Sequence, residues 1–337
     1  MSNITMADAK RMILACYNAN EPLLLLGSPG MGKTSLFLSV TKELDIGYIP
    51  NILSQKDPVD VGGMRVPDMK TGILRHFIPE DLPIEGKSNH PKKGILHYDE
   101  INVVAMMLQA TTYGIIQERR VGLHSIMPGW VPMASGNHVA DRSAAQRISL
   151  ALANRFNVQH VVPDVQSWLD QYGSEHVDTR GTAYLRFRPE LFHCMPVESS
   201  EIRFPSARSW TKAFKFIDEE PKFRRKIFAG YVGDTAADDF EAFWRIMENA
   251  TTFDQIVATP TQARVPDQQD TGTYYAVAGM IARLMDRKTI NPVMQYVERM
   301  HRDYQVVIMQ DATRREPGLK NTHAYGKWVV ANQDVTL

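Results

Sequence analysis

Hydrophobic positions divide the chain into two halves with different patterns. In the first half, short apolar runs alternate with stretches of helical period, such as the apolar face of Met12, Ile13, Cys16 and Tyr17. Strands are predicted at 23–26, 48–53, 95–98, 131–134 and 158–162. Alternating strands and helices are typical of a parallel α/β sheet. We therefore predict an αβα domain with a five-stranded parallel sheet over residues 1–163.

The second half of the chain has a helical pattern. From Pro163 onward strand patterns nearly vanish, and helices are predicted at 206–219, 235–247, 274–285, 292–300, 303–315 and 322–331. Asn291-Pro292 reads as a helix start, with a capping side chain before a proline. We expect a helical region over 164–250 and a helical extension over 251–337.

One segment of the first half shows neither the apolar runs of strands nor the helical period. Between residues 57 and 94, ten of 38 residues are Pro or Gly, which predicts loop and hairpin. The segment is longer than an ordinary connection, and long structured loops usually have a function. We interpret 57–94 as an inserted hairpin region.

Composition narrows the classes of protein that the chain can belong to. It has 337 residues, with 38 basic against 38 acidic side chains, which excludes a globally basic nucleic-acid coat. The apolar run at 23–26 is far too short to span a membrane, and the first residues contain no secretory leader. Cys16 and Cys194 have no metal-binding spacing. We expect a soluble, cytoplasmic protein with no membrane partner.

The strongest motif is a glycine-rich loop between the strand at 23–26 and the next helix. It reads Gly27-Ser28-Pro29-Gly30-Met31-Gly32-Lys33-Thr34, which matches G-x-x-x-x-G-K-[ST], and Ser35 extends it. Glycines let backbone N–H groups curl around phosphate oxygens, and a helix N-terminus adds partial positive charge. We expect these nine residues to bind ATP, with Lys33 at the β- and γ-phosphates and Thr34 on Mg²⁺.

A second motif ends the strand at 95–98. Asp99 and Glu100 follow an apolar run, and in a P-loop sheet a neighbouring strand delivers an Asp to the metal. We assign Asp99 to the Mg²⁺ shell and Glu100 to the general base that activates water. The alternative is a strand end with two solvated acids.

At these residues the sequence resembles a known family, the MoxR branch of the AAA+ ATPases, which carries an insertion at helix 2. Asp99-Glu100-Ile101-Asn102, followed by a helix and Ile116-Gln117-Glu118-Arg119-Arg120-Val121, is similar to its D-E-I-N-R and L-I-Q-E-x-x-V segments. Val103 stands where the family has Arg. Weaker likenesses lie at 57–63, 134–137, 151–156 and 205–210, so the resemblance spans about residues 20 to 245. It implies a P-loop αβα sandwich followed by an all-helical AAA+ lid.

The resemblance also implies three further site residues. Asn137 matches the sensor-one position, where its amide would orient water or contact the γ-phosphate; a turn cap is the alternative. Arg155, in an N-R-F segment, would act as an arginine finger on a neighbouring subunit. Arg208 matches the sensor-two helix start and would reach back over the phosphates. Surface roles remain open for both arginines, and Arg142 and Arg147 are competitors for the finger.

The partners follow from the resemblance as well. It implies a homo-oligomeric ring, a hexamer, that remodels a protein substrate in the manner of a chaperone, often beside a von Willebrand factor A partner protein. Residues 117–126 read as a hairpin with a charged tip that would face the pore. Two alternatives stay open: a motor that moves along nucleic acid, and a scaffold whose assembly is gated by nucleotide.

Overall fold

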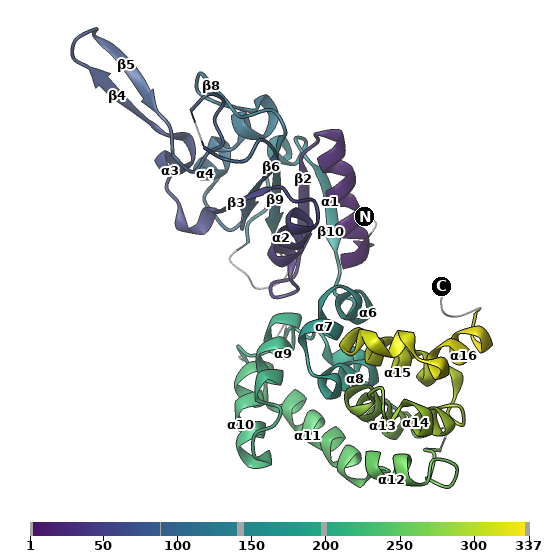
Figure 1. Ribbon diagram of the computed structural model, residues 1–337. Helices are drawn as coiled ribbons and strands as arrows, with labels where there is room; N and C mark the ends of the chain where they lie inside the picture. The colour runs from purple at the N-terminus through teal and green to yellow at the C-terminus, as the bar shows by residue number, and fades with distance from the viewer. Residues whose placement is uncertain (1–2, 88, 140–144, 197–200, 268, 334–337) are drawn as a thin grey trace. The chain divides into compact units, whose positions relative to one another are not determined.

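The chain divides into two compact units, Met1–Pro163 and Asp164–Leu337 (Figure 1). The computed structural model describes residues 3–87, 89–139, 145–196, 201–267 and 269–333. No helix in this described part of the chain is both long enough and apolar enough to cross a membrane.

The first unit is built on a parallel sheet whose order is β1-β10-β2-β9-β6-β3. These strands are β1 (Asn3–Ile4), β2 (Leu23–Gly27), β3 (Gly47–Ile52), β6 (Gly94–Asp99), β9 (Trp130–Gly136) and β10 (Asn157–Val161). The prediction of a parallel α/β sheet is confirmed, but five strands was wrong because the sheet has six. The missed strand, β1, has two residues that pair with β10 at the edge, too few to produce a hydrophobic alternation.

Both faces of this sheet are covered. Alternate leucines of β2 point to opposite sides, so Leu23 and Leu25 join one buried core and Leu24 joins the other. The first core is closed by α1 (Met6–Ala19) and α2 (Lys33–Glu43). The second lies under α3 (Pro58–Gly62), α4 (Met106–Thr111) and a short π-helix (Gly114–Glu118). Burial on both faces explains why β2 is a continuous apolar run.

Two antiparallel hairpins extend the first unit. Within the inserted region, β4 (Met64–Asp68) and β5 (Ile73–Phe77) pair with each other only, and they project from the unit at the upper left of Figure 1. The second hairpin pairs β7 (Arg120–Val121) with β8 (His124–Ser125). Both segments were predicted to contain hairpins, and each contains one. The prediction of loop and hairpin without helix over 57–94 is wrong at its start, where α3 lies.

The second unit is helical, as predicted. Its α-helices are α6 (Val165–Trp168), α7 (Ser174–His176), α8 (Thr179–Phe187), α9 (Ala207–Ala213), α10 (Pro221–Val232), α11 (Asp234–Asn249), α12 (Phe253–Ala258), α13 (Thr271–Leu284), α14 (Ile290–Val297), α15 (Arg302–Arg315) and α16 (His323–Ala331). The sequence interpretation missed α6, α7, α8, α10 and α12. It was also wrong about Asn291, which lies inside α14 because that helix begins at Ile290.

Two hydrophobic cores lie within this unit. One is aromatic and contains Tyr184, Trp210 and Phe240, while the other contains Ile281 and Tyr296. Helix α13 contributes to both, because its Ala276 belongs to the aromatic core and Ile281 to the second. The predicted division into parts 164–250 and 251–337 stays a prediction.

Candidate functional site: the P-loop and the ends of β6 and β9

The glycine-rich loop connects the end of β2 to the start of α2. Gly30 and Gly32 adopt φ values of 80° and 104°, a left-handed conformation that side chains disfavour. Gly27 is required for space, because an added Cβ would lie 2.5 Å from Met31 Sδ and 2.9 Å from the Val161 carbonyl oxygen. Met31 itself is buried, while Ser28 and Pro29 are half-buried. The loop therefore forms a backbone cradle at a helix N-terminus, which suits a phosphate group.

Lys33 lies in this cradle. Its side chain is buried, and Nζ donates to the carbonyl oxygens of Gly27 at 2.6 Å and Ser28 at 3.0 Å. A third bond, of 3.2 Å, runs to Asn137 Oδ1 at the end of β9. The structure thus brings together two residues that the sequence assigned to the phosphates, although they are 104 positions apart.

Thr34 and Asp99 meet on the other side of the loop. Thr34 Oγ1 donates to Asp99 Oδ2 at 2.6 Å. A hydroxyl and a carboxylate are hard oxygen ligands, and Mg²⁺ commonly takes only one or two protein oxygens beside phosphates and water. The pair fits the expected ion, whereas the described residues contain no group of three or more His, Cys, Asp or Glu arranged for a metal. Ser35 follows on α2 with an exposed side chain.

The Asp99 carboxylate is held ionised by its surroundings. Burial alone would raise its pKa, but neighbouring His97 and hydrogen bonds from Ser135, Thr34 and the Glu100 N–H outweigh burial and lower the pKa below its usual value. Asp99 is therefore a carboxylate at neutral pH, as a metal ligand must be.

Glu100 adopts a backbone conformation that is rare for its residue type. Its φ is 58°, in the left-handed region, and such a residue costs on the order of 1–2 kcal/mol when it is not glycine. Its Oε2 accepts a short hydrogen bond from the Ser54 hydroxyl, just beyond β3. Ser54 had no signal in the sequence, because it belongs to no motif and reaches Glu100 only through the pairing of β3 with β6.

Asn137 is fixed by a residue that the sequence interpretation gave no role. Asn102 is buried, its Nδ2 donates to the Asn137 carbonyl oxygen at 2.8 Å, and its Oδ1 accepts from the Asn137 N–H at 3.0 Å. Gly136 makes room for this clamp, since an added Cβ there would lie 2.5 Å from Asn102 Oδ1. Asn102 therefore positions the amide that contacts Lys33.

The two predicted arginines lie in different units. Arg155 follows α5 (Leu150–Ala153), where its Nη1 donates to the Ala151 carbonyl oxygen and its guanidinium lies 4.6 Å from the centre of the Tyr113 ring. Arg208 lies in the first turn of α9 in the second unit, with an exposed side chain. The roles of both stay predictions. Of the competitors, Arg142 lies outside the described residues.

The charged tip predicted for the hairpin at 117–126 is wrong in detail. The turn between β7 and β8 holds Gly122 and Leu123, and Leu123 is 92% exposed. Arg119 instead donates to the Asn20 carbonyl oxygen at the end of α1, and Arg120 pairs with Glu118 at 2.8 Å. The tip is therefore apolar, and the two arginines lie at its base.

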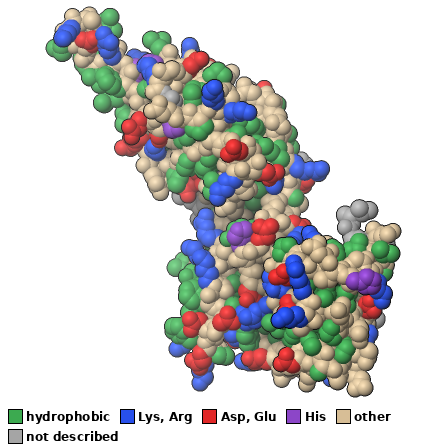
Figure 2. All heavy atoms as spheres, viewed as in Figure 1, with side chains coloured by type: hydrophobic (Ala, Val, Ile, Leu, Met, Phe, Trp, Pro, Cys, Tyr) green, Lys and Arg blue, Asp and Glu red, His purple; other side chains and the backbone are tan. Residues whose placement is uncertain are grey.

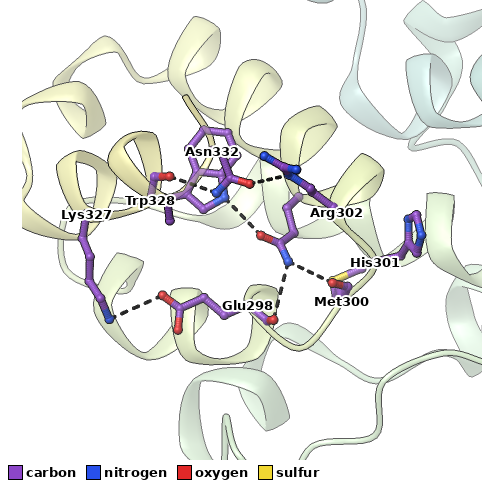
Figure 3. Close-up of a pocket in the computed structure, with 9 residues that line it drawn as sticks. Glu298, Met300, His301, Arg302, Lys327, Trp328 and Asn332 are labelled. Atoms are coloured by element: carbon purple, nitrogen blue, oxygen red, sulfur yellow. Dashed lines mark hydrogen bonds and ion pairs between the residues drawn. The ribbon is translucent and has the colours of Figure 1, made fainter. Parts of the chain in front are cut away.

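The second unit contains a pocket of about 540 Å³ (Figure 3). Its charged side chains already have partners: Lys327 lies 3.7 Å from Glu298, and Arg302 donates to Asn332 Oδ1 at 3.0 Å. None of the predicted site residues lines it.

Comparison with known proteins gives likenesses of structure only. No family model matches the chain, and no curated protein matches its sequence. Among solved structures, a protein from Cytophaga hutchinsonii provisionally described as an ATPase is 14% identical, covering 92% of this chain and 81% of its own, with a TM-score of 0.37. A mutant of RuvB from Thermotoga maritima is 15% identical, covering 77% of each chain, with a TM-score of 0.40.

A third structure, the Thermotoga maritima RuvB Holliday junction branch migration motor, is 14% identical with a TM-score of 0.37 and covers 76% of this chain and 75% of its own. At this level of similarity, the function has to follow from the side chains of the site.

Proposed function

We propose that the protein is an AAA+ ATPase that hydrolyses ATP to ADP and phosphate. The observation that carries the proposal is the convergence of Lys33, Thr34, Asp99, Glu100 and Asn137 at the carboxyl ends of three neighbouring strands, β2, β6 and β9. Ligands of open parallel sheets bind at this edge. The convergence supports one site that holds the phosphates and also contains a base.

Each residue has a role that follows from its chemistry. Lys33 and the loop N–H groups bind the β- and γ-phosphates. Thr34 and Asp99 would hold Mg²⁺, which when bound neutralises charge on the phosphate oxygens. Glu100 takes the proton of the attacking water, and the Asn137 amide orients that water. The Ser54 hydroxyl holds Glu100 through Oε2, so the base has to leave Ser54 or to act through Oε1.

The proposal includes assembly into a homo-oligomeric ring, a hexamer. A guanidinium is always protonated and its planar fork suits a phosphate, so Arg155 would serve the γ-phosphate of a neighbouring subunit. In the single chain it lies over the Tyr113 ring, a contact worth about 0.5–2 kcal/mol that Arg155 gives up to reach a neighbour. Arg208 would couple the helical unit to the nucleotide state.

The β4–β5 hairpin favours a protein as the partner that is remodelled. Five of its apolar side chains are more than half exposed: Met64, Met69, Ile73, Leu74 and Phe77. Figure 2 shows hydrophobic side chains along this arm together with charged ones. Exposed apolar groups gathered on one element are a mark of protein interaction sites, whereas nucleic-acid interfaces are more polar and more positively charged. A von Willebrand factor A protein is one candidate for this partner.

The test of the ATPase compares Glu100→Gln with Lys33→Ala and with Glu85→Gln, an exposed control in the same unit. Binding of a fluorescent ATP analogue and release of phosphate are measured for each. Glu100→Gln is expected to bind but not to hydrolyse, because the amide cannot take a proton. Lys33→Ala is expected to lose binding, and Glu85→Gln to match wild type. Hydrolysis by Glu100→Gln at the wild-type rate would refute Glu100 as the base.

A further inference from the structure

A chain of four buried or half-buried side chains ends on Asp99. Tyr48 on β3, His97 and Asp99 on β6, and Ser135 on β9 lie on the sheet face that α2 covers. The Tyr48 hydroxyl lies 2.7 Å from His97 Nδ1, His97 Nε2 lies 2.9 Å from Ser135 Oγ, and Ser135 Oγ lies 2.5 Å from Asp99 Oδ1. His97 and Ser135 are completely buried, so water does not compete for these bonds.

The direction of every bond in this chain is fixed by chemistry. The Asp99 carboxylate can only accept, so the Ser135 hydroxyl has to donate to it. Ser135 Oγ then accepts from His97 Nε2–H, and in the neutral imidazole this leaves Nδ1 without a proton. That nitrogen accepts from the Tyr48 hydroxyl. The tautomer of His97 is therefore assigned by the hydrogen bonds on both sides of its ring.

This chain of hydrogen bonds gives the two oxygens of the Asp99 carboxylate different partners. Oδ1 of Asp99 accepts from Ser135 and, at 2.9 Å, from the Glu100 N–H. Oδ2 is thereby directed to Thr34, the other oxygen of the proposed metal shell. Hydrogen bonds that served only to satisfy buried polar groups would not need to end on this carboxylate. Metal ligands, by contrast, commonly depend on outer hydrogen bonds that orient them.

We propose that Ser135 is a positioning residue for the metal shell, and that His97 and Tyr48 act through it by fixing the direction of its hydroxyl proton. The role rests on the proposed ATPase function. It predicts that the network sets how strongly Mg²⁺ strengthens nucleotide binding, because only a correctly turned carboxylate presents Oδ2 to the ion. Binding without Mg²⁺ depends on Lys33 and the backbone N–H groups of the loop, and not on the ion that Asp99 Oδ2 would hold.

The experiment measures the affinity for a fluorescent ATP analogue in Mg²⁺ and again in EDTA. The variants are Ser135→Ala and Tyr48→Phe. The control is Thr41→Val, which removes a buried hydroxyl that bonds only to the Leu38 carbonyl oxygen on α2. Loss of an outer hydrogen bond commonly costs about 10–100-fold in metal affinity. Ser135→Ala is therefore expected to lose about tenfold or more of the Mg²⁺ enhancement and to keep its affinity in EDTA. Tyr48→Phe is expected to lose less, and Thr41→Val nothing.

Two results would overturn the positioning role: a Mg²⁺ enhancement in Ser135→Ala equal to that of Thr41→Val, or an equal loss of affinity with and without Mg²⁺, which marks a structural residue. If Ser135→Ala does not fold, Tyr48→Phe decides by the same criterion. Wild-type protein that binds no nucleotide in either buffer would instead refute the proposed function, and the positioning role with it.

Discussion

Replacement of Asn102 by alanine tests how the end of β9 is held beside Lys33. The variant removes both hydrogen bonds to the Asn137 backbone, of 2.8 and 3.0 Å, and leaves one N–H and one C=O without these partners. A buried group that loses its partner costs about 1–3 kcal/mol. Because Asn137 is only half-buried, we expect the two losses together to lower the free energy of unfolding of the first unit by about 2–4 kcal/mol.

The assay is urea unfolding followed by circular dichroism, with and without ATP and Mg²⁺. The two units are expected to unfold separately, and the transition that shifts with nucleotide reports the first unit, because a ligand stabilises only the unit that binds it. Nucleotide affinity is measured in parallel and is expected to fall, since a released Asn137 no longer faces Lys33.

The control is Asn249→Ala, which removes an exposed asparagine at the end of α11 and is expected to change stability by less than about 0.5 kcal/mol. Asn102→Asp is expected to be intermediate, because it keeps the acceptor for the Asn137 N–H and loses the donor. If Asn102→Ala unfolded at the same urea concentration as Asn249→Ala, with unchanged affinity, the clamp would have no energetic role and our reasoning would be refuted.

Three further predictions concern Arg155, Arg208 and His97. Arg155→Ala is expected to bind ATP normally and to hydrolyse it about a thousandfold more slowly; mixing it with Lys33→Ala is expected to restore activity if the finger acts across a subunit interface. Arg208→Ala is expected to reduce turnover more than ATP affinity or the melting temperature, measured on one preparation. Burial lowers the pKa of His97 from 6.5 to about 4. Between these two pKa values the unfolded chain takes up a proton that the folded chain does not. The contribution of neutral His97 to the free energy of unfolding is therefore fully present above about pH 6.5 and is lost toward pH 4, by on the order of 3 kcal/mol. His97→Gln is expected to lose less stability over this range in unfolding titrations.

Each of these predictions has an outcome that contradicts it. Absence of recovery in co-assembled mixtures would place Arg155 in its own subunit's site or in a structural role. A lower melting temperature of Arg208→Ala, without a specific loss of turnover, would make Arg208 structural. Identical pH dependence of stability in His97→Gln and wild type would mean that folding does not lower the pKa of His97.

The sequence was sufficient for the parts of the site that lie close together along the chain. The glycine-rich loop and Asp99-Glu100 are contiguous motifs next to apolar strands, so their place at strand ends could be predicted. Ser54, Asn102 and Ser135 could not be given roles, because each acts on a residue of a different segment. Their partners become visible only when the order β9-β6-β3 is known.

The helices and strands differ in the same way in how well the local sequence predicts them. The prediction placed five strands and most helices within a few residues, since their periodicity is local. It missed β1, which is defined by pairing with β10, and α10, whose twelve residues begin with a proline and include four basic ones. Both elements are stabilised by contacts with other segments of the chain, which a local sequence pattern does not report.

Helix α13 limits where the second unit can be truncated. Its Gly279 lies so close to α8 that an added Cβ would be 2.7 Å from Ala183 Cβ, and its Ala276 fills the aromatic core. A protein truncated after residue 250 would therefore lack a wall of the core that lies before the cut. Helix α13 is thus an integral part of the helical unit, because it completes a core that is otherwise built from the helices before residue 250.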